Sequence, residues 1–252
     1  MDSMDASHKF LKSGRGPEWE AIQRDQDKGV PTPPFQQSYP ADVPLIDLVA
    51  PEDLNVGDVS LVDALSRRRS HRKFTREPLT LEELSFLLWV TQGVKRVRSD
   101  GMATLRTVPS AGSRHPLETY LLVHHVQSLA PGLYRYLALE HKLCFLHPHA
   151  EPAPDKWFLR NSAVVFVWSA VPYRTEWRHS TFSHKMIAMD AGHVCQNLYL
   201  ACEAIGAGTC AVGVYWQDEM DALLGLDGVD EFTLYVAPVG KIQRTKSEAS
   251  QH

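Results

Sequence analysis

The chain has 252 residues, of which 44% are hydrophobic and 22% are charged, and its formal net charge is −4. This composition is ordinary for a soluble globular protein with one large domain or two small ones, and the mildly acidic balance argues against nucleic-acid binding over the whole surface. No apolar run approaches the length of a membrane span, and the polar, acidic start is unlike a signal peptide, so we expect a cytoplasmic protein.

Cysteine and histidine usage gives no sign of a metal site. The four cysteines, Cys144, Cys195, Cys202 and Cys210, form no CxxC pair, and we expect them to be reduced core thiols. None of the twelve histidines stands at ligand spacing with a cysteine or carboxylate cluster. The sequence therefore predicts no bound metal.

Residues 1–57 are rich in charge, proline and loop-forming residues and lack sustained periodicity. We predict an extended N-terminal arm with one short helix around Trp19 to Arg24, wrapped on the body or on a partner subunit and covering part of the dimer or the pocket mouth. The body is expected over 58–244, followed by a flexible polar tail over 245–252.

A basic run follows the arm. Apolar residues at helical spacing predict a short helix over 59–66, and the run Arg67-Arg68-Arg69-Ser70-His71-Arg72-Lys73 comes directly after it. Two interpretations are open at this point. The run can be a solvated helix C-terminus, where cations complement the helix dipole. Alternatively, its guanidiniums and the Ser70 hydroxyl can form a phosphate site.

Further elements follow from periodicity and from turn residues. Thr80 and Glu83 form the capping box of a helix that Gly93 ends. Strands are predicted over 117–123, 133–136, 143–146, 163–168, 209–215 and 233–239, and helices over 187–205 and 218–224. This order predicts an α+β fold, in which long helices cover one sheet.

Two loops of small residues offer backbone that a flat ligand can approach closely. They are Pro109-Ser110-Ala111-Gly112 and the segment 206–213. Taken singly, each is also typical of tight turns and close packing. The chain carries no Gly-x-Ser-x-Gly elbow, no P-loop and no dinucleotide-binding fingerprint, which argues against serine hydrolase and P-loop or Rossmann chemistry.

A set of sequence pieces in this order resembles the FMN-dependent nitroreductase superfamily, and within it the SagB-type branch that includes peptide thiazoline and oxazoline oxidases. The pieces are the basic run, the capped helix, the Pro109–Gly112 loop, Pro131–Tyr136, Asp190–Leu198, the 206–213 loop and Pro238–Lys241. They span residues 58–244. The resemblance implies a nitroreductase-like sandwich, with a central, mainly antiparallel sheet flanked by helices, that binds FMN at the interface of an intertwined homodimer.

The resemblance also implies roles for individual residues. The phosphate and ribityl side is expected to be held by Arg68, Ser70 and Arg72, with Arg69 close by. Lys241 or Arg244 is expected to add a phosphate contact. The flavin is expected to be lined, from the other subunit, by Pro109, Ser110, Ala111 and Gly112. The ring near N5 is expected to face the backbone of Ala211, Val212 and Gly213.

One departure concerns the substrate side. Azoline oxidases carry a Lys-Tyr pair shortly before the Ala-Gly-His-x-x-x-Asn helix, where this chain has Arg178-His179. Arginine is not deprotonated in proteins, so it cannot replace a tuned lysine as a general base, which disfavours peptide-azoline dehydrogenation. His179 and His184 remain as candidate catalytic residues that titrate near neutral pH; the alternative is that they are surface or packing histidines.

These observations predict an FMN-dependent oxidoreductase that relays hydride through flavin N5, from NADH, NADPH or a substrate, to a nitroaromatic, quinone or similar acceptor. Two alternatives remain: a SagB-like dehydrogenase of a modified peptide or natural product, and a non-catalytic relative that binds flavin or another phospho-ligand or peptide. The expected partners are a second subunit and a small-molecule or peptide substrate. Nucleic acid is disfavoured because the basic run lacks interleaved aromatics, and no membrane partner is expected.

Overall fold

A seven-stranded antiparallel sheet forms the centre of the computed structural model, which describes residues 8, 10–12, 16–148 and 157–243. The strand order is β1-β6-β5-β4-β7-β9-β8. The strands are β1 (Leu45–Asp47), β4 (Leu117–Val123), β5 (Gly132–Leu137), β6 (Lys142–His147), β7 (Val164–Ala170), β8 (Ala207–Thr209) and β9 (Phe232–Lys241). A separate hairpin joins β2 (Val94–Val97) and β3 (Thr104–Arg106).

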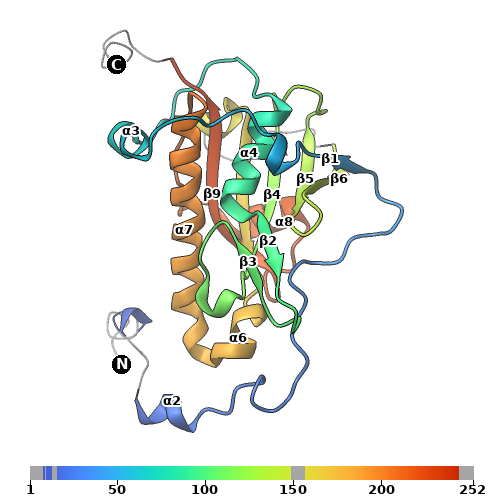
Figure 1. The fold of residues 1–252 in the computed structure, drawn as a ribbon, viewed down its shortest axis with the longest axis vertical. Coiled ribbons are helices and arrows are strands. Elements are labelled where there is room, and N and C mark those ends of the chain that lie inside the picture. The colour runs from blue at the N-terminus through green and yellow to red at the C-terminus, as the bar shows by residue number, and fades with distance from the viewer. Residues whose placement is uncertain (1–7, 9, 13–15, 149–156, 244–252) are drawn as a thin grey trace.

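Helices cover both faces of the sheet. One core layer contains apolar residues of α4 (Leu81–Gln92) and α7 (Ser183–Ala204), and the other contains residues of α5 (Trp157–Arg160) and α8 (Gln217–Leu224). Figure 1 shows α7 running alongside β9. All seven residues of β7 are buried, because a strand covered on both faces contacts apolar side chains on each. The α+β sandwich predicted from the sequence is therefore confirmed.

Local signals account for several element boundaries. Thr80 and Glu83 form the predicted capping box at the start of α4, and Gly93 caps its end. The short helix predicted before the basic run is α3 (Leu61–Arg67), whose N-cap Ser60 accepts a hydrogen bond from the Asp63 backbone N–H. The basic run therefore begins at a helix C-terminus, as expected.

Other elements differ from the prediction. The strand expected over 209–215 is wrong in extent, because β8 ends at Thr209 and only an isolated bridge pairs Val212 with Val236. The chain leaves the ladder here because the Ala211 N–H donates to a side chain, the Tyr199 hydroxyl, at 2.9 Å. The helices and strands that were not predicted include β1, β2, β3, α5 and α6 (Tyr173–His179).

The N-terminal arm contains α2 (Pro17–Ala21), close to the helix predicted around Trp19, and then runs along the body to β1 (Figure 1). Four arginines, each at most 8% exposed, hold its residues 32–38: Arg106, Arg114, Arg135 and Arg174. Arg174 Nε, for example, donates to the Pro34 carbonyl at 2.9 Å. Charged donors bound to backbone carbonyls fix this segment more firmly than its loop-like composition suggests.

In the described parts of the chain, no helix is both long enough and apolar enough to span a bilayer. All four cysteines belong to these parts and are buried, free thiols. Burial raises the pKa of the Cys195 thiol to about 12, so this thiol stays protonated at neutral pH.

Candidate functional site

The Tyr199 hydroxyl joins two of the segments expected to contact a flavin. It lies 2.9 Å from Ser70 Oγ in the basic run and accepts the Ala211 backbone N–H at 2.9 Å. The Arg68 guanidinium lies over the tyrosine ring, 5.4 Å from its centroid. The structure thus brings the basic run and the 211–213 segment together on the C-terminal half of α7.

Backbone pairing fixes the basic run in place. Ser70 pairs with Thr209 in a parallel bridge, and the His71 N–H donates to the Thr209 carbonyl at 2.8 Å. Gly208 permits this close approach, since a Cβ there would lie 2.7 Å from the His71 Cβ. The run therefore covers β8, the edge strand of the sheet.

Several polar atoms around the run favour an anionic ligand. Arg69, Ser70 and Arg72 are exposed. The first interpretation of the run placed its cations in solvent, but the Arg67 Nε and Nη2 atoms are buried and have no hydrogen-bond partner among the described residues, as is also true of Thr209 Oγ1. Buried donors without partners are costly. A phosphate group supplies the acceptor oxygens that such a donor set lacks, so the residues present fit the phosphate of FMN.

Much of the backbone expected to face the flavin ring is already hydrogen-bonded within the chain. The Ala211 N–H is bonded to Tyr199, and the Val212 N–H donates to the Val236 carbonyl at 2.8 Å. Gly213 is exposed. Among these three positions, Gly213 is thus the one whose backbone lies open at the surface.

Lys241 and Arg244 were expected to add a phosphate contact. The Lys241 ammonium pairs with the Glu83 carboxylate and donates to the Ile205 carbonyl at 2.8 Å. These contacts join α4 to the end of α7, so Lys241 has a structural task within one chain. Arg244 lies outside the described residues.

The Pro109–Gly112 loop packs on the other half of α7. Ser110 Oγ donates to Asp190 Oδ2 at 2.5 Å, and the Ala111 N–H donates to Asp190 Oδ1 at 3.2 Å. Burial raises the pKa of the Asp190 carboxyl, and these two hydrogen bonds oppose the rise. The loop is therefore attached to the helix through one buried carboxyl group.

Arg178 and His179, the pair that departs from the azoline oxidases, lie against this loop. Gly112 has a φ of 59°, and a Cβ there would be 2.6 Å from Arg178 Cδ and 2.8 Å from His179 Nε2. Neither ring nitrogen of His179 has a hydrogen-bond partner in the described part of the chain. Burial, followed by repulsion from Arg178, Arg24 and Arg114, lowers the pKa of His179. His179 is thus a half-buried histidine whose two ring nitrogens are buried and can accept or donate a hydrogen bond.

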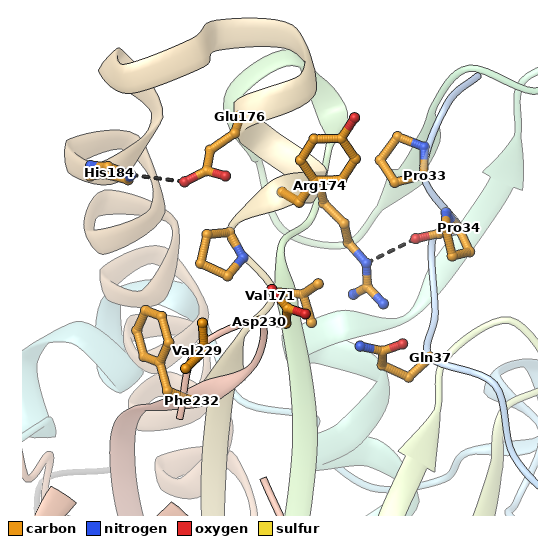
Figure 2. A pocket seen from close by; sticks show the side chains of 12 residues that line it. Pro33, Pro34, Gln37, Val171, Arg174, Glu176, His184, Val229, Asp230 and Phe232 are labelled. Carbon is orange, nitrogen blue, oxygen red and sulfur yellow. Dashed lines mark hydrogen bonds and ion pairs between the residues drawn. The ribbon is translucent and has the colours of Figure 1, made fainter. Parts of the chain in front are cut away.

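His184 lies elsewhere, in a cavity of about 610 Å³ between the arm, α6 and the segment before β9. Figure 2 shows His184 paired with Glu176, at 2.9 Å, and Arg174 reaching from α6 to the arm prolines. The cavity walls also include Gln37, Val171, Val229, Asp230 and Phe232. The two candidate histidines therefore do not share one site in a single chain.

The two candidate flavin-contact regions are separated along α7. Asp190 and Tyr199 are nine residues apart, or two and a half turns, which is about 13 Å along the helix axis and places them on opposite sides of it. One chain therefore does not bring the Pro109–Gly112 loop next to the basic run.

The sequence did not predict the contacts of the Tyr199 hydroxyl or the burial of the Arg67 guanidinium nitrogens. Nothing in the sequence distinguishes Tyr199 from a packing aromatic, since its partners, Ser70 and Ala211, lie 129 and 12 residues away. The signal for Arg67 was present in its position: it is the last residue of α3, where a side chain can turn back onto the body.

A sandwich of this topology, with a basic run against the sheet edge and a small-residue loop on the long helix, defines an oxidoreductase fold of the nitroreductase type. The chain belongs to the nitroreductase family, whose model matches residues 65–241. It is 32% identical, over 193 residues, to a protein of Methanocaldococcus jannaschii provisionally named a nitroreductase; the alignment covers 74% of this chain and 93% of that protein.

Solved structures agree on the fold. A nitroreductase-type structure from Ralstonia eutropha has a TM-score of 0.67 and 25% identity, and the match covers 85% of this chain and all of that one. A second, from Anabaena variabilis, has a TM-score of 0.70 and 23% identity; 93% of this chain matches 45% of that longer one. A chain of the Escherichia coli microcin synthetase McbBCD complex has a TM-score of 0.58 at 18% identity, covering 97% and 98% of the two chains.

Proposed function

We propose that the protein is an FMN-dependent oxidoreductase that works as a homodimer and reduces a nitroaromatic, quinone or similar acceptor with electrons from NADH or NADPH. FMN, when bound, supplies the reversible hydride and electron chemistry that no amino-acid side chain provides. Membership of the nitroreductase family supports the general class of reaction. The cofactor, the electron donor and the acceptor are our proposal.

One observation carries the cofactor assignment: the convergence of Arg68, Ser70 and Ala211 on Tyr199. The same basic run contains Arg67, whose Nε and Nη2 atoms are buried without a partner among the described residues. Arg68, Arg69, Ser70 and Arg72 would hold the phosphate, because guanidinium and hydroxyl donors match its oxygens. The Tyr199 bridge would keep the run and the 211–213 segment at a fixed spacing.

The homodimer would complete the site. In one chain the Pro109–Gly112 loop and the basic run lie about 13 Å apart along α7, which supports a pocket whose two halves come from different subunits. Large apolar side chains stay exposed on α3 and near Gly213: Leu61, Val62, Leu65, Val214 and Trp216. Several exposed apolar side chains on one short helix are typical of an interaction surface, and Figure 1 shows α3 beside α7 at the edge of the molecule.

The cofactor assignment is tested by absorbance and by FMN titration. We expect the purified protein to carry a flavin band, or to acquire one with FMN, and the Arg68→Ala plus Arg72→Ala variant to lose it. Arg96→Ala plus Arg98→Ala removes two exposed arginines of the β2 hairpin region and should leave the band unchanged. A protein that stays colourless with FMN would contradict the proposal and favour a binding module for another phospho-ligand or peptide.

The electron donor is tested by stopped-flow reduction of the bound flavin. We expect NADH or NADPH to bleach the flavin band, and a nitroaromatic or quinone to restore it. If only an alcohol or azoline substrate bleaches the band, the alternative of a SagB-like dehydrogenase of a modified peptide or natural product is correct instead. Arg178 stands where that branch has lysine, which favours the first outcome because arginine does not serve as a base.

The proposed homodimer can be tested through the oligomeric state of a variant in α3. Leu61→Glu plus Leu65→Glu places two charges on the exposed face of α3, whose side chains are 64% and 51% exposed in one chain. We expect this variant to sediment as a monomer and to lose FMN while retaining its fold. A variant that stays dimeric would exclude α3 from the interface.

The remaining parts of the proposal concern organisation and location. We assign residues 58–244 to the FMN-binding body, 1–57 to the arm and 245–252 to the tail, and we place the protein in the cytoplasm. His179 would exchange a proton with the acceptor, since it lies against the loop that faces the ligand. His184, paired with Glu176 in a separate cavity, is the second candidate.

A further inference from the structure

His179 is held in place by contacts from two directions. On one side lies the Pro109–Gly112 loop. Residue 112 of this loop is a glycine, and any larger residue there would clash with the His179 imidazole. On the other side lies Trp19 of the arm, whose ring is 6.5 Å from the His179 ring and inclined by 27° to it. Both ring nitrogens are buried without a partner among the described residues, so packing rather than hydrogen bonding fixes the ring.

The turn that carries His179 is strained. Ser180, directly after it, has φ 50° and ψ −141°, a left-handed backbone conformation that non-glycine residues rarely adopt. Such a conformation persists only where the surroundings enforce it. Trp19 contacts both sides of this turn, because its ring also meets Phe182 edge-on at 5.0 Å.

The arm is itself attached to the helix that ends at His179. The Gln26 N–H donates to the Trp177 carbonyl at 3.0 Å, and Trp177 Nε1 donates to the Val30 carbonyl at 2.8 Å. The Arg24 guanidinium lies 5.9 Å from the centre of the Trp19 ring. The two hydrogen bonds therefore attach the arm at residues 26 and 30 to α6, and the cation–π contact connects Trp19 to Arg24, close to this attachment, within the arm.

From these contacts we propose that Trp19 is a positioning residue of the candidate active site, which covers His179 and holds its imidazole against the Gly112 loop. The arm is then part of the reaction site, although its sequence is typical of a linker. The proposal rests on the proposed function only for the consequence that His179 exchanges a proton during turnover. The geometric part, in which Trp19 shields His179, can be tested without turnover.

The charges around His179 give the shielding a measurable readout. Three arginines disfavour the protonated ring: Arg178 on the same helix, Arg24 on the arm and Arg114 after η2 (Ala111–Ser113). On α7, His184 is hydrogen-bonded to Glu176. Burial makes the largest contribution to the lowered His179 pKa. Removing the indole that covers the ring should therefore raise this pKa towards the ordinary histidine value.

The test measures the His179 pKa by NMR in the full-length protein, with its imidazole signal assigned through His179→Gln. Trp19→Ala should raise the pKa by ~1 unit, within the range that histidine environments span in proteins. Trp19→Phe keeps an aromatic ring against the histidine and should stay close to the wild-type value. Tyr39→Ala, also in the arm but beside Lys142, is the control and should have no effect.

The kinetic readout separates this inference from the function on which it builds. If Trp19→Ala shifts both the His179 pKa and the matching limb of the turnover-versus-pH profile, with FMN affinity unchanged, both proposals are supported. If the pKa shifts and the profile does not, Trp19 still positions His179, and the proton-transfer role of His179 is wrong. If the pKa stays at the wild-type value in a folded Trp19→Ala variant, the positioning role of Trp19 is refuted.

Discussion

At the scale of single residues, the Tyr199 hydroxyl has the most consequential position in the candidate cofactor site. One oxygen contacts both the Ser70 side chain and the Ala211 backbone, so it couples two segments that belong to different parts of the sheet edge. A phenylalanine would preserve the ring beneath Arg68 and remove only this coupling.

Tyr199→Phe should therefore weaken FMN binding without unfolding the protein. Loss of two hydrogen bonds, each worth about 1 kcal/mol, corresponds to a roughly thirtyfold rise in the dissociation constant if both depend on the bound geometry. Titration of the apoprotein by flavin fluorescence gives the value. Tyr134→Phe, which loses one hydrogen bond to the Ala130 carbonyl far from the site, is the matched control. Equal FMN affinities for the two variants would contradict the role of Tyr199.

Gly112 is a second residue with a sharp prediction. Its φ of 59° and the closeness of Arg178 and His179 leave no room for a methyl group. Gly206 has a similar φ of 67°, and a Cβ there meets nothing within 4 Å among the described residues. Both alanine substitutions carry the left-handed penalty of about 1 kcal/mol. In urea unfolding, Gly112→Ala should lower the free energy of unfolding more than Gly206→Ala does. Equal losses would mean that Arg178 and His179 move aside without a measurable loss of stability.

At the scale of elements, the arm and the body are joined through buried charge. The Arg174 guanidinium, 1% exposed, bonds the Pro34 carbonyl and pairs with Glu118, 4% exposed, at 2.5 Å. Glu118 in turn accepts the Gln37 backbone N–H at 2.8 Å. Both members of this ion pair therefore form a hydrogen bond to the arm.

Breaking this pair should destabilise the whole fold. Arg174→Met leaves the Glu118 carboxylate buried without its partner, a change that typically costs about 3–5 kcal/mol. Adding Glu118→Gln to the same chain should restore part of the loss in the free energy of unfolding, measured with urea. A double variant as unstable as Arg174→Met alone would show that the lost arm contact, and not the unpaired charge, causes the effect.

The elements that the sequence predicted share one property, which is that their signals are local. The Thr80–Glu83 capping box and the apolar periodicity of α7 depend on residues a few positions apart, and β7 is recognisable as one apolar run. One element that was missed, α6, depends instead on a distant polar partner. α6 places Arg174 in the core against Pro34, 140 residues away, and such pairing leaves no periodic trace.

The candidate site divides in the same way. The basic run and both small-residue loops were recognisable by composition, and their order along the chain indicated the family. The Tyr199 bridge, the burial of Arg67 and the contact of Trp19 with His179 were not recognisable. Each is made by one side chain of unremarkable type, whose importance comes from where the folded chain places its partner.

At the scale of the whole molecule, buried histidines should make stability depend on pH. Burial, and then repulsion from Arg106, lowers the pKa of His115 to about 3. In the unfolded chain this histidine takes up a proton near pH 6.5, whereas the folded chain resists protonation until about pH 3. Stability is therefore full above about pH 6.5 and falls as the pH drops towards 3, by about 1.4 kcal/mol per unit from this residue.

Urea unfolding at pH 7 and pH 5 should show this loss, and His115→Asn should reduce it. Asparagine tolerates the left-handed backbone of residue 115, whose φ is 47°. Asp190 and Glu231, whose pKa values are raised by burial, act in the opposite direction in both proteins and so cancel from the comparison. An identical pH dependence in the two proteins would contradict the role of His115.

The arginine contacts of the arm also have a consequence for the order of events during synthesis. Residues 32–38 leave the ribosome well before Arg106, Arg114, Arg135 and Arg174, the four side chains that hold them. Synthesis proceeds at several residues per second, while local folding takes far less time. A nascent chain that ends before Arg174 therefore lacks one of the four side chains that hold the arm, and we expect proteases to cut its arm more readily than the arm of the completed chain.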